Sequence, residues 1–426
     1  MNIDELLKHD CFKNLKYRVE TDKNHDIKVI GVGNGGGNAV NNLFYQNIEG
    51  ATLVLCDTNE RKMQKSPVSM QIVLKTPPLK DIDLSKYSEE DREKIRIYYE
   101  GTGGEPGFGA GNEPIIAQLA AEYTLEEIKE LLKGTKMVFL TASMGGGSGT
   151  GATSVIAKAC KDLNILTVGI VTLPFIWEGK LKMRSAWKGV ENMKPYVDDL
   201  LIILNDRLTD KAILEKYRDK LSIADDGSVE PADDEIFKLA DNVLADAVKS
   251  VVEIVDKTGY MDLDFADINA ALKNGGGTIM DFGFGTGDDR FYTAMNNALG
   301  SPLLQNIDIS KATKIILAVF SSEDYKFSQR EFDEIKRFSK RFADEYWFKL
   351  GMYRDNTLGE RAKVTIIATG ANDEDILPSE IMEILNMPII ERPVRYEDKS
   401  PLKILDDQRK LTEYQENMAY SRIFKL

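Results

Sequence analysis

The chain has 426 residues, a hydrophobic content of 42% and a formal net charge of −14 at pH 7. This length predicts more than one structural unit, and the apolar content is sufficient for ordinary buried cores. The acidic balance argues against sequence-independent nucleic-acid binding and against adsorption on anionic lipid, because both depend on an excess of lysine and arginine.

The few cysteines and histidines restrict the chemistry further. Cys11, Cys56 and Cys160 form no Cys-x-x-Cys pair, so we expect neither a disulfide framework nor a zinc site, and we assign no metal ligands. Both histidines, His9 and His25, precede the first predicted strand, so acid–base chemistry would depend on carboxylates. The N-terminus does not resemble a signal peptide, and no apolar run reaches the roughly 18 residues of a membrane span. We therefore expect a protein of the reducing cytoplasm that does not insert in a membrane.

Strands and helices alternate after a charged N-terminal extension, residues 1–26. The predicted strands cover residues 27–30, 52–56, 137–141, 166–172 and 199–204, and predicted helices cover 38–46 and 153–163. Such alternation predicts an α/β fold, a parallel sheet wrapped by helices, with ligand sites at the C-terminal ends of the strands.

A long helix is predicted over residues 233–257, because apolar residues recur at i, i+3, i+4 and i+7. A smaller α+β unit is expected over residues 258–370. It contains predicted strands at 314–320 and 363–368 and a polar helix at 329–342. The charged segment 371–426 contains four prolines (Pro378, Pro388, Pro393 and Pro401) and is expected to form a partly ordered tail.

The first glycine-rich segment, residues 31–38, follows a predicted strand and satisfies the pattern Gly-x-Gly-x-x-Gly. Asp57 stands at the end of the next strand. This combination is typical of dinucleotide binding, although glycines that only make a tight turn are an alternative.

The second glycine-rich segment is Gly145-Gly146-Gly147-Ser148-Gly149-Thr150-Gly151, between a predicted strand and a predicted helix. Glycine lets main-chain N–H groups approach phosphate oxygens, and a helix N-terminus adds partial positive charge. The sequence contains no P-loop, so this site would act without the P-loop lysine. Two such segments in one sheet favour a nucleoside triphosphate over the single dinucleotide of an NAD-dependent oxidoreductase, which stays as an alternative.

These two segments resemble FtsZ, the tubulin-like GTPase family of bacterial cell division. The first matches the family's first nucleotide loop, and Thr141-Ala142-Ser143-Met144 with the glycine run matches its signature loop. The similarity covers most of residues 27–370. It implies a tubulin/FtsZ-like fold, with a Rossmann-like GTP-binding domain at 27–232, a central helix at 233–257 and a GTPase-activating second domain at 258–370.

The resemblance also assigns binding residues for GTP or GDP. Ala110 and Gly111 match the loop near the γ-phosphate, Glu178 matches the ribose-binding glutamate, and Lys182 stands where relatives often have arginine. Asn205 resembles an asparagine that contacts base or sugar, and Asn38 is expected to open the first helix. The phosphates would be held by Gly33, Asn34, Gly35, Gly36, Gly145, Gly146, Gly147, Ser148, Gly149 and Thr150.

Phe237 and Asp241 lie four residues apart on the long helix and therefore share a face. Phe237 would stack on the purine, and the Asp241 carboxylate would accept hydrogen bonds from N1–H and the 2-amino group of guanine. Adenine lacks that pair of donors. By residue type alone, Phe237 would be assigned to the core.

The segment Met261-Asp262-Leu263-Asp264-Phe265-Ala266-Asp267 resembles the family's synergy loop, which enters the nucleotide pocket of the next subunit. The resemblance gives Asp264 and Asp267 the catalytic role of polarising the attacking water and helping to hold the cation, for which Mg²⁺ is expected. Asp262 replaces the usual asparagine. Without the family, such an acidic loop is typical of a solvated turn or a helix N-cap.

Several segments depart from the family pattern. Cys56-Asp57-Thr58-Asn59 inverts the usual Asn-Thr-Asp order, and residues 75–102 and 219–233 look like hydrophilic surface insertions. The last residues, Tyr420 to Leu426, are a candidate divergent docking peptide.

The resemblance implies a self-assembling GTPase of the cytoplasm that forms the cytokinetic ring and septum beneath the membrane. Its expected partners are other copies of itself, head to tail, and membrane-anchoring and regulatory division proteins that bind the tail. We expect no nucleic-acid partner. A nucleotide-binding relative that regulates filaments without polymerising is an alternative.

Overall fold

The computed structural model describes residues 25–223, 229, 231–257, 259–273, 275–300, 312–340, 346–371 and 379–386. Nearly all of the predicted N-terminal extension lies outside these residues, and so do most of the predicted tail and its last seven residues. The described part of the tail contributes the helix α15 (Ser379–Asn386), whose Ile381 and Ile384 are buried.

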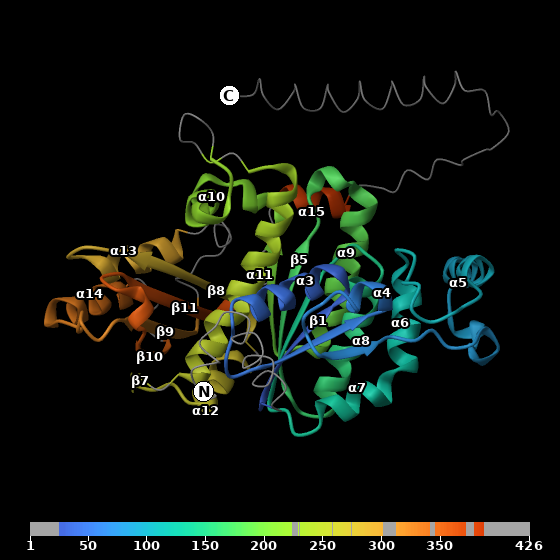
Figure 1. Ribbon diagram of the computed structural model, residues 1–426, viewed down its shortest axis with the longest axis horizontal. Helices are drawn as coiled ribbons and strands as arrows, with labels where there is room; N and C mark the ends of the chain where they lie inside the picture. Colours follow the sequence, from blue (N-terminus) through green and yellow to red (C-terminus); the bar gives the residue numbers. More distant parts are fainter. Residues whose placement is uncertain are drawn as a thin grey trace, which may run out of the picture. The chain divides into compact units, whose positions relative to one another are not determined.

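The described strands form one hydrogen-bonded sheet in the order β3-β2-β1-β4-β5-β6-β8-β11-β9-β10-β7 (Figure 1). Their bounds are β1 Ile27–Val32, β2 Thr52–Asp57, β3 Met70–Val73, β4 Met137–Ser143, β5 Leu166–Leu173, β6 Asp199–Leu204, β7 Gly259–Met261, β8 Gly276–Gly285, β9 Lys314–Ser321, β10 Trp347–Arg354 and β11 Ala362–Ala371.

The strands β3, β2, β1, β4, β5 and β6 are all parallel to their neighbours. Every residue of β1 and of β5 is buried, as expected for a parallel sheet with helices on both faces. The predicted α/β fold class is therefore confirmed for this half of the molecule.

Two groups of helices cover this parallel half. The hydrophobic core on one face includes residues of α3 (Gly33–Tyr45), α4 (Glu60–Met63), α10 (Lys211–Lys216) and α11 (Asp233–Asp256). The core on the other face includes residues of α5 (Glu89–Thr102), α6 (Pro114–Tyr123), α7 (Leu125–Leu132), α8 (Ser148–Asp162) and α9 (Lys180–Met193).

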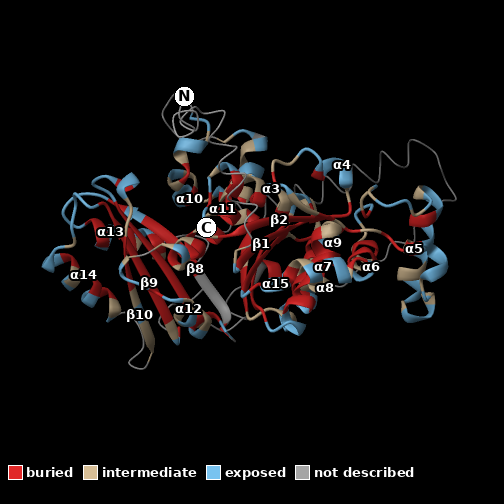
Figure 2. Cartoon of the chain, turned by 60° about the horizontal axis from the view of Figure 1, so that its bottom comes forward, coloured by how far each residue is buried: buried red, intermediate tan, exposed pale blue. Residues whose placement is uncertain are grey.

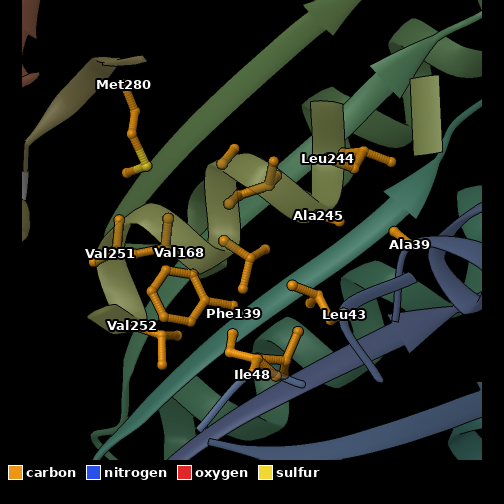
Figure 3. Close-up of a cluster of buried hydrophobic side chains, with 14 of the residues drawn as sticks. Ala39, Leu43, Ile48, Phe139, Val168, Leu244, Ala245, Val251, Val252 and Met280 are labelled. Atoms are coloured by element: carbon orange, nitrogen blue, oxygen red, sulfur yellow. The ribbon is translucent and has the colours of Figure 1, made fainter. Parts of the chain in front are cut away.

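Helix α11 confirms the long helix predicted over residues 233–257. Figure 3 shows its Leu244, Val251 and Val252 in the same cluster as Phe139 of β4 and Met280 of β8. The wide apolar stripe of α11 thus packs against both the parallel strands and the start of the second half. One continuous helix connects the two halves of the molecule.

The second half is a mixed sheet with α12 (Phe265–Leu272), α13 (Arg290–Leu299) and α14 (Gln329–Ser339). Strand β11 is antiparallel to β8 and to β9, and β10 is parallel to β9 and antiparallel to β7. Ile315, Leu317 and Val319 of β9 pack with α13 and α14, whereas Ile316 and Phe320 belong to the core that contains α11. In Figure 2 β9 is largely buried, part of β10 is only half-buried, and the outer sides of the helices are exposed.

The two halves share the sheet through β6 and β8. Among the described residues, two pairs make this parallel contact, Asp199 with Gly276 and Leu200 with Gly277. The predicted smaller α+β part is confirmed, but its strands extend the sheet of the first half. The short strands β3 and β7, together with β8 and β10, have no counterpart among the predicted strands.

Candidate nucleotide site

A cavity of about 550 Å³ opens at the C-terminal ends of the parallel strands. Its walls are formed by the loops after β2, β4, β5 and β6 and by the N-terminal parts of α3, α8 and α11. It brings together most of the predicted binding residues: Asn34, Gly35, Asn38, Ala110, Gly111, Gly146, Gly147, Ser148, Gly149, Glu178, Lys182, Asn205, Phe237 and Asp241.

Both glycine-rich segments are partly helical. Helix α3 begins at Gly33 and α8 begins at Ser148, each several residues before the predicted start. Asn38 therefore lies inside α3 and does not open it, which corrects the prediction. The glycines make these early starts possible: a Cβ on Gly36 would lie 2.2 Å from the Thr141 carbonyl oxygen, and one on Gly149 would lie 2.4 Å from that of Ser143. Two helix N-termini, whose first N–H groups have no carbonyl partner within their own helix, thus reach the edge of the cavity.

Four predicted phosphate-binding residues do not line the cavity: Gly33, Gly36, Gly145 and Thr150. The buried Thr150 hydroxyl oxygen accepts a hydrogen bond from the Gly145 N–H at 2.8 Å. This contact fixes the turn between β4 and α8. In this structure, Thr150 therefore stabilises the backbone of the glycine segment and does not itself line the cavity.

A group of oxygen atoms lies where the two helix N-termini meet β2. The Ser148 hydroxyl donates to the Asp57 carboxylate at 2.8 Å and lies 2.8 Å from the Thr58 hydroxyl. All three residues line the cavity. Carboxylate and hydroxyl oxygens of this kind are suitable ligands for Mg²⁺. Among the described residues, no group of three or more His, Cys, Asp or Glu side chains could hold a metal ion.

Glu178, Lys182 and Asn205 form another wall. The Glu178 carboxylate accepts a hydrogen bond from the Phe175 N–H at 2.9 Å and is paired with the Lys182 ammonium group. Asn205 is buried, and its side-chain oxygen has no hydrogen-bond partner among the described residues. Because an unpaired buried acceptor is unfavourable, Asn205 is suited to receive a hydrogen bond from a ligand.

Phe237 and Asp241 face the cavity from α11, as their spacing predicts. Phe237 is 46% exposed and meets Phe175 edge-on, with ring centroids 5.6 Å apart, so it is no core residue. Burial raises the pKa of the Asp241 carboxyl to about 7, and a hydrogen bond from Asn38 opposes this shift. A carboxylate that lacks enough donors is prepared to accept hydrogen bonds from a bound ligand.

Several lining residues were not assigned from the sequence: Asn59, Lys62, Phe108, Asn112, Thr172, Pro174 and Ala240. Lys62 is of interest because it supplies a positive charge, with its ammonium nitrogen 3.2 Å from the Asn34 side-chain oxygen. Nothing in the sequence distinguishes Lys62 from Arg61 and Lys65, the other basic residues of the polar stretch between β2 and β3.

The predicted catalytic acids lie in the second half and do not line the cavity. Asp264 is the N-cap of α12, and its carboxylate accepts a hydrogen bond from the Asp267 N–H at 2.8 Å. Asp267 is paired with Lys349 at 2.7 Å, a contact that raises the pKa of Lys349. Asp262 accepts a hydrogen bond from the Gly259 N–H. The N-cap alternative for this acidic loop is therefore present in the fold.

Comparison with known proteins decides the family. The model of the Tubulin/FtsZ family GTPase domain matches residues 26–212, and that of the FtsZ family C-terminal domain matches residues 276–372. The cell division protein FtsZ of Porphyromonas gingivalis is 36% identical over 88% of this chain and 74% of its own length. This chain belongs to the FtsZ family. The FtsZ of Coxiella burnetii is 33% identical over 82% of this chain and 79% of its own length.

Solved structures agree with this assignment. An empty FtsZ dimer of M. jannaschii has a TM-score of 0.65 and 30% identity over 85% of this chain and 92% of its own. CetZ2 of Haloferax volcanii shares the fold, with a TM-score of 0.61, 84% of this chain and 97% of its own covered, and 16% identity. The FtsZ family carries its GTPase domain where the dinucleotide-like pattern occurs, so the oxidoreductase alternative is set aside. No described helix is long and apolar enough to cross a membrane.

Proposed function

We propose that this protein is a GTP-hydrolysing, self-assembling filament protein of prokaryotic cell division. The observation that carries the proposal is the cavity itself: two helix N-termini face it from one side and Phe237 and Asp241 from another. Phosphates fit against the first group and a purine base against the second. The family match supports GTP as the nucleotide.

Guanine is favoured over adenine at Asp241. The ionised carboxylate accepts hydrogen bonds only, and guanine offers N1–H and the 2-amino group side by side. Adenine offers an acceptor at N1, so the same carboxylate would meet a lone pair. Phe237 contributes a partly exposed ring on which the base can stack.

The sugar and phosphates would be held by separate groups. Glu178 and Asn205 would provide hydrogen-bond acceptors for ribose hydroxyls, and the N–H groups of the cavity-lining Gly146, Gly147 and Gly149 would bind the phosphates. Lys62 adds charge where a P-loop lysine is lacking. A bound Mg²⁺ ion, next to the Asp57, Thr58 and Ser148 oxygens, would neutralise phosphate charge.

Hydrolysis would need a second subunit, because Asp264 and Asp267 lie outside the cavity of their own chain. In a head-to-tail contact these carboxylates enter the neighbour's cavity, orient a water molecule and accept its proton as the water attacks the terminal phosphorus atom. The products are GDP and phosphate. Such a contact is heterologous and does not close, so it forms filaments.

Exposed apolar side chains, both beside the cavity and next to the acidic loop, support a contact between the cavity of one subunit and the acidic loop of the next. Trp177 and Leu181 are 71% and 74% exposed beside the cavity, and Tyr260 is 81% exposed on β7, next to the acidic loop. Large exposed apolar side chains are typical of interaction surfaces. In the cell we expect the filaments at the division site beneath the membrane, joined to anchoring and regulatory division proteins.

The test is GTP hydrolysis measured against protein concentration. A shared site predicts a specific rate that rises above a threshold concentration, whereas a site within one chain gives a constant specific rate. The constant rate would contradict the proposal.

A mixing experiment separates the two halves of the shared site. An Asp241→Ala variant has a damaged cavity with intact acids, and an Asp264→Asn variant has damaged acids with an intact cavity. Each alone should be nearly inactive, and a mixture should regain part of the activity through mixed contacts. If the mixture stays as inactive as its components, the acids do not act in the neighbour's cavity.

A non-polymerising nucleotide-binding regulator is the second candidate. It is favoured by one observation, the occupation of Asp264 and Asp267 in capping α12 and pairing Lys349. Light scattering with GTP and Mg²⁺ distinguishes the two: no rise at any protein concentration would favour the regulator.

A further inference from the structure

The segment 75–102, which looks like an insertion relative to the FtsZ pattern, contributes a helix next to the nucleotide cavity. This helix is α5, and it lies beyond α6 from the parallel strands (Figure 1). Three of its side chains, Ile95, Tyr98 and Tyr99, are buried in the same core as Ala110 and residues of α6. The segment is thus packed onto the domain and is no loose surface insertion.

Helix α5 leads directly into the loop that lines the cavity. The helix ends at Thr102, with Gly103 as its C-cap, and the cavity-lining stretch 108–112 begins six residues after Thr102. Tyr98 is 8% exposed and does not line the cavity itself, but its hydroxyl donates to the Gly109 carbonyl oxygen at 2.9 Å. Its ring also reaches to 3.8 Å from the position that a Cβ on Gly111 would take.

The loop depends on such outside contacts for its shape. Gly107, Gly109 and Gly111 have φ values of 91°, 89° and 58°, and Asn112 has 64°. A chain with so many residues in the left-handed region has no regular backbone pairing of its own. The Gly109 N–H donates to the Thr58 carbonyl at 3.0 Å, so Gly109 is held through its N–H by the β2 turn and through its carbonyl by Tyr98.

The 108–112 loop in turn packs closely against the second glycine-rich segment, at the side of the cavity to which the phosphates are assigned. A Cβ on Gly147 would lie 2.9 Å from the Ala110 Cβ and 3.2 Å from the Glu113 nitrogen. A displacement of Gly109 would therefore move the wall that faces the Gly146–Gly149 segment. Because Tyr98 acts on that wall through Gly109, it is a positioning residue.

We infer that α5 is a positioning element of the nucleotide site and that the Tyr98 hydroxyl holds the 108–112 loop in the shape that receives the terminal phosphate. This inference rests on the proposed function, since it assigns the phosphates to that side of the cavity. It predicts that the loss of one hydroxyl, outside the cavity, changes the discrimination between nucleoside triphosphate and diphosphate.

The chain offers a matched control in the next residue. Tyr99 is 7% exposed, lies on the same helix and donates its hydroxyl to the Pro77 carbonyl, which does not line the cavity. Tyr98→Phe and Tyr99→Phe remove the same atom from neighbouring positions. A general loss of stability should be similar in both variants.

The experiment measures the dissociation constants of GTP and GDP for the full chain and both variants, below the concentration at which assembly begins. Tyr98→Phe should weaken GTP binding about fivefold, the effect of one hydrogen bond, and weaken GDP binding less. Tyr99→Phe should leave the GTP-to-GDP ratio at the wild-type value. Amide hydrogen exchange of residues 108–112 should be faster in Tyr98→Phe alone.

Each outcome decides between the two proposals. If both variants keep the wild-type ratio, or change it equally, the inference about Tyr98 is wrong and the proposed function stands. If the wild-type chain binds neither GTP nor GDP, the proposed function is wrong and the inference falls with it. Faster exchange at 108–112 in both variants also contradicts a specific role for Tyr98.

Discussion

Asp264 and Asp267 cap the N-terminus of α12 reciprocally: the Asp264 carboxylate accepts from the Asp267 N–H at 2.8 Å, and the Asp267 carboxylate lies 3.4 Å from the Asp264 N–H. The same two carboxylates are the proposed catalytic acids. A variant that lacks one of them therefore changes both the helix and the chemistry, and the two effects have to be separated.

Asp264→Asn separates them, because asparagine caps a helix about as well as aspartate and carries no charge. We expect Asp264→Asn to keep the wild-type unfolding temperature and GTP affinity and to lose most of its GTP turnover. Asp264→Ala should lose turnover and also about 1 kcal/mol of stability, since the cap is removed. Turnover near the wild-type rate in Asp264→Asn would leave Asp264 with a structural role only.

The pKa of Asp241 predicts a pH dependence of GTP binding. The carboxyl has a pKa of about 7 in the ligand-free fold, and guanine needs the ionised form. GTP affinity should therefore rise with pH up to about 7 and then level off, and below that value it should fall by up to about tenfold per pH unit. The measurement is the ratio of wild-type to Asp241→Asn affinity from pH 5.5 to 8.5, in which the titration of the phosphates cancels. A ratio that does not change with pH would contradict the role of Asp241.

The same pKa has a consequence for the ligand-free protein. The folded-state pKa lies above the ordinary aspartate value of 3.8, so the folded chain holds a proton that the unfolded chain has lost between these two values. The contribution of Asp241 to the free energy of unfolding therefore decreases as pH rises from about 4 to 7. Asp241→Asn should remove this decrease in chemical denaturation experiments without GTP.

Lys62 is expected to strengthen nucleotide binding through its charge. It lines the cavity beside Asn34 and is exposed, so its contribution is screened by solvent. Lys62→Met should weaken GTP binding about threefold to fivefold and reduce its dependence on salt. Lys65→Met is the control, because Lys65 is also exposed but does not line the cavity. Equal effects of both variants would show that only the overall charge matters.

The sequence predicted the elements that have a regular pattern. The bounds of β6 agree with the prediction, and α11 differs from it by one residue at its end, because continuous apolar runs and a wide helical stripe are strong local signals. Strand β3 has four residues and is only partly buried, and β7 has three exposed or half-buried residues. Such short strands are stabilised by hydrogen bonds to a neighbouring strand, β2 for β3 and β10 for β7, so their own sequences do not predict a strand.

In the candidate site, too, features with a regular sequence pattern could be predicted, and features that depend on packing could not. Phe237 and Asp241 could be placed on one face of a helix by their spacing, and the glycine segments by their composition. The early starts of α3 and α8 could not, since they depend on the approach of Gly36 and Gly149 to carbonyl groups of β4. Lys62 and Tyr98 could not be predicted either. Lys62 lines the cavity and Tyr98 contacts the cavity-lining Gly109 only because of how their segments pack, and the sequences of these segments show no motif that indicates such a role.

Ion pairs of Glu253, on α11, are expected to hold the second half of the molecule to this helix. Glu253 pairs with Lys363 of β11 at 2.7 Å and has Lys249 and Lys257 at 4.0 Å, and the side chains of Glu253 and Lys363 are only 14% and 11% exposed. Glu253→Gln leaves the Lys363 charge nearly buried without its partner, so we expect a loss of about 2 kcal/mol in the free energy of unfolding. A second substitution, Lys363→Met, should restore most of this loss, because it removes the unpaired charge and puts an apolar side chain next to the rings of Phe282 and Phe320, over which the Lys363 ammonium nitrogen lies. Glu130→Gln, at an exposed pair with Lys133, should change stability by less than about 0.5 kcal/mol. If chemical denaturation gives the same small effect for Glu253→Gln as for Glu130→Gln, the cluster does not hold the second half to α11.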